Sequence, residues 1–164
     1  RALGVKLIGT VSSPEKAALA KANGAWATID YSHENVAQRV LELTDGKKVP
    51  VVYDGVGKDT WLTSLDSAAP RGLVVSFGNA SGAVDGVNLG ILAGKGSLYV
   101  TRPTLGTYAN NADNLQRMAD ELFEMIISGK LTVDISQRFP LADAAKAQTE
   151  LSARRTTGSV VLLP

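Results

Sequence analysis

Cysteine is absent from the sequence, and histidine occurs once, at His33, among 164 residues. Without cysteine the chain has no disulfide and no thiolate for catalysis. A zinc site built by this chain is not expected, because zinc in proteins is held mainly by cysteine and histidine. His33 follows Tyr31 and Ser32 in a polar segment, so we expect a solvent-exposed side chain rather than a ligand or a proton-transfer group.

The sequence also has no large excess of positive or negative charge and no long apolar run. The chain carries 17 Lys and Arg against 16 Asp and Glu, for a net charge of +1, which argues against a broad surface for nucleic acid. No apolar run reaches the roughly 18 residues of a membrane span, and no secretory signal pattern is present. We therefore expect no nucleic-acid partner, no membrane partner and a cytoplasmic location.

Apolar runs and helical segments alternate along the chain, and the composition (45% hydrophobic, 20% charged) is ordinary for a globular domain. Buried strands are predicted at residues 5–11, 25–29, 49–53, 72–77, 97–101 and 159–163. Helices are predicted from residue 14 to 22, over 36–43, around 61–65, before residue 129 and over 142–153. Strands separated by helices of about ten residues are typical of parallel βαβ units. The sequence therefore predicts an α/β fold with a doubly wound parallel sheet.

The first candidate site is the corner between the opening strand and its helix. An Asp or Glu at the end of the second strand of a nucleotide-binding sheet accepts the ribose 2′-hydroxyl of NAD and repels the 2′-phosphate of NADP. Here the corner holds Ser12 and Ser13 at a helix N-terminus, which favours an anion, with Lys16 on the first turn. An ordinary capped helix with a surface lysine explains the segment equally well.

The second candidate, Asp54-Gly55-Val56-Gly57, resembles a dinucleotide fingerprint, but Thr60 stands in the place of the third glycine. The better interpretation is a turn whose glycines let the backbone approach a ligand closely. At the end of the next strand, Phe77, Gly78 and Asn79 have the chemistry to pack against a flat carboxamide ring and to hydrogen-bond it. A plain turn explains these three residues about as well.

Four longer stretches complete the pattern: VVYDGVGKDTW, RGLVVSFGNASG, VNLGILAGKGSLYVTRPTL and ARRTTGSVVLLP. Together they resemble the bacterial NADPH:quinone oxidoreductase family, a zinc-independent, ζ-crystallin-like branch of the medium-chain dehydrogenase/reductase superfamily. The resemblance covers residues 1–164. It implies a truncated NADP-binding Rossmann-type domain with a C-terminal return, lacking its first strand, its glycine-rich turn and the N-terminal GroES-like substrate domain.

The missing strand has a consequence for the sheet. Residues 1–4 have the pattern of a last helical turn with its glycine stop, and no strand precedes them. In the order 3-2-1-4-5-6, strand 1 lies between strands 2 and 4. We therefore expect a gap of one strand between residues 5–11 and 49–53, and a chain that lacks reductase activity alone.

The resemblance also implies roles for individual residues. The adenosine 2′-phosphate end of NADPH is assigned to Ser12, Ser13, Lys16 and Tyr31. Arg154 is a further cofactor contact, with Arg155 as its neighbour. The turn Asp54, Gly55, Val56 and Gly57 lies beside the cofactor, and Phe77, Gly78 and Asn79 lie near the nicotinamide. No catalytic acid or base and no metal ligand is assigned.

The family's reaction is hydride transfer from NADPH to a quinone, for which the cofactor carries the chemistry. The resemblance also implies a homodimer formed through the strand near residues 98–100. Three alternatives stay open: a noncatalytic NADPH-binding module, a crystallin-like structural protein, and a reductase of another acceptor such as an enone. A two-component receiver domain is disfavoured, because the acidic pair and the later lysine which that chemistry needs are absent.

Overall fold

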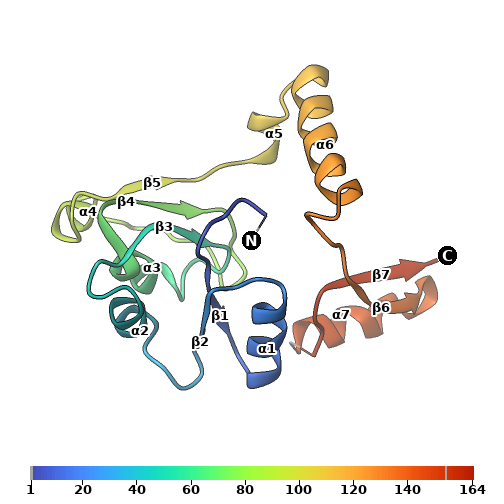
Figure 1. Cartoon of the computed structure of the whole chain (residues 1–164), viewed down its shortest axis with the longest axis horizontal. Coiled ribbons are helices and arrows are strands. Elements are labelled where there is room, and N and C mark those ends of the chain that lie inside the picture. The colour runs from blue at the N-terminus through green and yellow to red at the C-terminus, as the bar shows by residue number, and fades with distance from the viewer. Residues whose placement is uncertain (1, 154) are drawn as a thin grey trace. The chain divides into compact units, whose positions relative to one another are not determined.

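The computed structural model describes residues 2–153 and 155–164. These residues form two compact units, Leu3–Leu115 and Gln116–Pro164. Figure 1 labels the elements of both units. Arg154, predicted as a cofactor contact, lies outside the described residues.

The first unit begins with a small parallel sheet of β1 (Ile8–Val11) and β2 (Ala27–Asp30). The helix between them, α1 (Pro14–Ala22), contacts both strands. Ile29 on β2 is fully buried, so apolar burial at the centre of this βαβ unit fixes which face of the sheet the helix covers.

The second sheet of this unit has the order β3 (Val49–Asp54), β4 (Ala68–Ser76) and β5 (Tyr99–Thr101), all parallel. Figure 1 shows the three strands side by side. The helices of this part of the chain are α2 (Val36–Leu43), α3 (Trp61–Ser67), α4 (Gly90–Gly94) and α5 (Leu105–Tyr108).

The core of the second sheet consists of Leu65, Ala68, Val74 and Leu98, with Trp61 packed against it. Trp61 and Leu65 are four positions apart and share a face of α3. We expect Leu62 on that same face from the sequence, but its side chain is 57% exposed, because neighbouring helical positions point in different directions. The α/β class with parallel strands is confirmed.

The two sheets of the first unit are separate. Within residues 2–153 and 155–164, β1 pairs only with β2, and β3 pairs only with β4. A cavity of about 290 Å³ is lined by Ile8 from one sheet and by Val49 and Pro50 from the other. The break between the two sheets falls at the position where the sequence predicts a gap.

The second unit contains a parallel pair, β6 (Ile135–Pro140) and β7 (Ser159–Leu163), joined by α7 (Ala144–Ser152). The long helix α6 (Ala112–Ile127) precedes this pair, and its residues from Gln116 onward belong to the second unit. The predicted bounds of the last strand are confirmed. Strand β6 is not predicted from the sequence, because its polar residues and final proline weaken the apolar signal.

Candidate functional site

The first group of candidate residues lies where β1 ends and α1 begins. Ser13 is the N-cap of α1, with an extended backbone, and its Oγ accepts a hydrogen bond from the backbone N–H of Lys16 at 3.3 Å. Pro14 occupies the first helical turn, where its fixed φ is favourable. A hydrogen bond from the Ser13 side chain lowers the pKa of Glu15 below its ordinary value. Ser13 is therefore the residue that caps α1.

The end of β2 lies beside this corner. The backbone N–H of Tyr31 donates to the carbonyl of Val11 at 3.0 Å, and Ser32 Oγ donates to the carbonyl of Ser12 at 3.4 Å. The Tyr31 side chain is 44% exposed. Four residues predicted from two separate segments therefore form one group, which we call the serine corner: Ser12, Ser13, Lys16 and Tyr31.

The second group is built around Asp54, the last residue of β3, which is buried at 5% exposure. Its Oδ1 accepts from the backbone N–H groups of Val56 (2.9 Å) and Gly57 (3.0 Å). Thr60 Oγ1 donates to both carboxylate oxygens, at 2.8 and 2.9 Å, and Ser64 Oγ donates to Oδ2 at 2.7 Å. The buried carboxylate stabilises the turn through these hydrogen bonds. It is not exposed, as an aspartate that accepts a phosphoryl group would be.

Two opposing effects set the pKa of Asp54. Burial raises the pKa of the carboxyl group, since a charged group is poorly solvated inside a protein. The hydrogen bonds from Ser64, Gly57, Thr60 and Val56 favour the ionised form and together leave the pKa below its ordinary value. Asp54 is therefore ionised at neutral pH and holds the turn as an anion.

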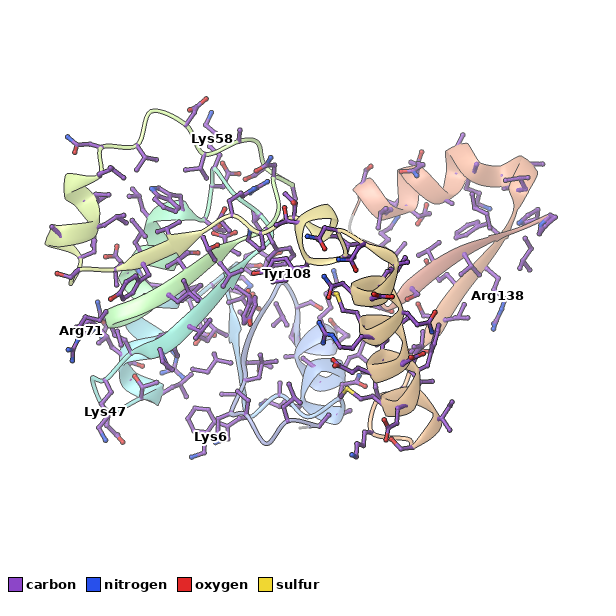
Figure 2. All side chains as sticks on the ribbon, turned by 90° about the horizontal axis from the view of Figure 1, so that it is seen from above. Lys6, Lys47, Lys58, Arg71, Tyr108 and Arg138 are labelled. Carbon is purple, nitrogen blue, oxygen red and sulfur yellow. The ribbon has the colours of Figure 1, made fainter. Side chains whose placement is uncertain are left out.

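The turn after β3 is interlocked with the turn after β4, and we call residues 54–57 and 77–82 together the double loop. The N–H of Phe77 donates to the carbonyl of Asp54 at 2.9 Å, and the N–H of Ser81 donates to the carbonyl of Val56 at 2.8 Å. The N–H of Lys58 donates to the carbonyl of Gly82 at 3.1 Å. Figure 2 shows Lys58 beside these turns, away from Lys47 and Arg71, where the strands begin.

Three glycines permit this approach. A β-carbon on Gly57, which has φ +94°, would lie 2.6 Å from the carbonyl oxygen of Gly82, and one on Gly78 would collide with the backbone of Gly55. A β-carbon on Gly55 would lie 3.0 Å from the ring of Phe77. The predicted glycine-dependent turn is thus confirmed, but its close partner in the described structure is the neighbouring loop.

Phe77 and Asn79 are presented at the surface of the double loop. The Phe77 side chain is 55% exposed although it follows a buried strand, and Asn79 is also exposed. An exposed ring beside an exposed amide is suited to contact a flat polar ligand. A plain turn would not require that ring at the surface.

Sequence reasoning misses one residue of this site, Arg102. Its Nη1 donates to Ser76 Oγ at 3.2 Å and to the carbonyl of Gly78 at 3.1 Å. Arg102 also lines a cavity of about 440 Å³ with Asn79 and Trp61. Its position directly after the strand in the VTRP segment is the signal that would have identified it, because ligands bind at the carboxyl ends of such strands.

Side chains that bind metal ions are not clustered in the described residues. No three of the His, Asp and Glu side chains in residues 2–153 and 155–164 gather closely enough to hold a metal ion. Within the same ranges, no helix is long and apolar enough to cross a bilayer.

Comparison with known proteins identifies relatives of this chain. The chain is 75% identical over 164 residues to a quinone oxidoreductase of Pseudomonas aeruginosa, covering all of this chain and 50% of that protein. A solved quinone oxidoreductase of Pseudomonas syringae is 80% identical with a TM-score of 0.96, over 99% of this chain and 50% of that chain. The chain thus spans about half the length of the curated relatives it matches.

A second solved structure is described as Escherichia coli quinone oxidoreductase complexed with NADPH. It is 54% identical to this chain with a TM-score of 0.96, over 99% of this chain and 51% of that chain. The family described as zinc-binding dehydrogenase matches residues 1–124, which hold both the serine corner and the double loop. The chain belongs to this dehydrogenase family, and the three relatives named above are described as quinone oxidoreductases.

Proposed function

We propose that this chain is the NADPH-binding part of an enzyme that transfers a hydride from NADPH to a quinone. The observation that carries the proposal is the serine corner. Its helix N-terminus has serines and Lys16 where an NAD-specific sheet has a carboxylate at the strand end. The relative from Escherichia coli, described as complexed with NADPH, supports the same cofactor.

The adenosine end of NADPH occupies the serine corner in this proposal. The backbone N–H groups and the dipole of α1 favour the 2′-phosphate, and Lys16 adds a positive charge. The hydroxyls of Ser12 and Ser13 donate hydrogen bonds to phosphate oxygens. To do so, Ser13 gives up its hydrogen bond to the Glu15 carboxylate. Tyr31 lies at the edge of the adenosine site, and Arg154 is proposed as a further contact.

The nicotinamide end lies against the double loop. Phe77 packs beside the ring and Asn79 hydrogen-bonds the carboxamide, while Gly78 and the turn Asp54 to Gly57 let the backbone approach closely. NADPH supplies the hydride, and the quinone gains that hydride and a proton to become a hydroquinone. This chain contributes orientation and exclusion of water, and no catalytic acid, base or zinc ligand.

We also propose that the whole protein is a cytoplasmic homodimer. β5 pairs on one side with β4, and Tyr99 and Val100 are 62% and 39% exposed. Leu98 is buried in the chain's own core. A second copy would therefore contact the side chains at 99 and 100 and the side of β5 that is unpaired within residues 2–153 and 155–164.

Two measurements test the function. Calorimetric titration of the chain with NADPH and NADH tests cofactor choice, and preferential NADPH binding is expected. Steady-state NADPH oxidation by the whole protein with a quinone tests turnover. Binding of NADPH without quinone-dependent oxidation would favour the noncatalytic NADPH-binding module. Oxidation of NADPH with an enone but not with a quinone would identify an enone as the acceptor. Preference for NADH would contradict the proposal.

A further inference from the structure

Arg102 joins the edge strand to the turn that follows the central strand. It is the first residue after β5, and its Nη1 bridges two acceptors of the β4 turn, Ser76 Oγ and the carbonyl of Gly78. Ser76 is buried at 6% exposure and ends β4. The cation therefore fixes both sides of Phe77, the residue between its two acceptors.

The opposite side of the same turn is held from β3. The carbonyl of Asp54 accepts from the N–H of Phe77 at 2.9 Å and from the N–H of Gly78 at 3.4 Å. Arg102 satisfies the acceptors of this turn while Asp54 satisfies its donors. A glycine in such a turn has more conformational freedom than any other residue, so fixed partners on both sides define where Phe77 and Asn79 point.

We propose that Arg102 is a positioning residue for the nicotinamide end of the cofactor, an inference that rests on the proposed NADPH-dependent function. It acts through the carbonyl of Gly78 and the hydroxyl of Ser76 and sets the orientation of the Phe77 ring and the Asn79 amide. Hydrogen bonds from a charged donor are among the stronger ones in proteins, and a guanidinium offers them in a fixed planar geometry.

The position of Arg102 allows this role to be separated from general stability. It is exposed and borders the cavity of about 440 Å³, and the core cluster of the second sheet does not include it. The serine corner belongs to the other sheet of this unit. Removing the guanidinium is therefore expected to affect the nicotinamide end and to leave the adenosine end unchanged.

The test uses the whole protein with Arg102→Met, which keeps the aliphatic stem and removes the donors, and Arg102→Lys, which keeps a cation. The ligands are NADPH and adenosine 2′,5′-bisphosphate, which lacks the nicotinamide. We expect Arg102→Met to weaken NADPH binding and to lower kcat with a quinone, each about ten-fold, with unchanged binding of the bisphosphate. Arg102→Lys should recover part of both losses.

Arg117→Met is the matched control, because Arg117 pairs with Glu121 on an exposed face of α6. It should leave the binding of both ligands unchanged. Ser76→Ala removes one acceptor and should show a smaller loss of the same kind, which keeps the test valid if Arg102→Met does not fold. Equal losses for both ligands, or no loss for NADPH, would overturn the positioning role. A wild-type protein that binds neither ligand would overturn the proposed function itself.

Discussion

Gly78 and Gly55 approach each other so closely that a β-carbon on Gly78 would overlap the carbonyl group of Gly55. The contact joins the turns after β3 and β4, backbone to backbone. The close fit at this edge of the sheet thus depends on the absence of a side chain at position 78.

Gly78→Ala should therefore destabilise the chain by about 1–3 kcal/mol, the usual range for overpacking against atoms that have no room to move. Urea unfolding monitored by circular dichroism measures the change. Gly106→Ala is the control, because a β-carbon there meets nothing within 4 Å. Equal stability of the two variants would show that the turns separate without penalty.

Asp54→Asn should lower the free energy of unfolding at pH 7 by about 1–3 kcal/mol, because buried donors lose a charged acceptor. The folded state lowers the pKa of Asp54, so the unfolded chain takes up a proton first as the pH falls. The stabilisation is complete above the ordinary pKa of 3.8 and is lost as the pH drops through the lower folded value.

Urea unfolding at a series of pH values between about 3 and 7 checks this prediction. The gap between wild type and Asp54→Asn should narrow toward the acid end. Asp85→Asn serves as the control at an exposed carboxylate, with a change within about 0.5 kcal/mol. A gap that stays constant with pH would mean that the charge of Asp54 contributes nothing.

Ser13→Asp separates the two roles of the serine corner. Aspartate is as good an N-cap as serine, so the free energy of unfolding should change by less than about 0.5 kcal/mol. The new carboxylate should repel a 2′-phosphate and weaken NADPH binding at least about ten-fold, with little change for NADH. Titration of both cofactors, alongside urea unfolding, tests this, and parallel losses for the two cofactors would refute a 2′-phosphate site.

Lys16→Glu should reverse the charge beside the same phosphate and weaken NADPH binding by about ten-fold or more, again sparing NADH. Lys21→Glu is the matched control, because Lys21 lies in the last turn of the same helix. It should alter the stability of α1 slightly and the cofactor preference not at all. If Lys16→Glu and Lys21→Glu weaken NADPH binding equally, the effect of Lys16→Glu comes from the change in net charge only.

Local signals in the sequence were sufficient for the elements that depend on neighbours in the chain. Pro14 with the Ser13 cap predicts the start of α1, and the bounds of α2 and β7 are confirmed. The strand β6 is not predicted because its polar residues and final proline give a weak apolar signal. Its pairing with β7 makes it a strand in spite of that composition.

In the candidate site, too, some features could be predicted from one segment of the sequence and others could not. The turn at Gly57 could be predicted, because its positive φ requires a residue such as glycine. The contact of Gly78 with Gly55 and the hydrogen bonds of Arg102 depend on the register of three neighbouring strands. Register is a property of the assembled sheet, so no single segment contains the signal for these contacts.

The separation of β1 from β3 leaves each strand with one side unpaired in the part of the chain that the structure describes. On β3 the residues Val51 and Tyr53 are 39% and 72% exposed. An open strand edge with apolar side chains is a template on which another extended segment can add. We therefore expect self-association of the chain to begin at this edge, and an extended segment paired along β3 to prevent it.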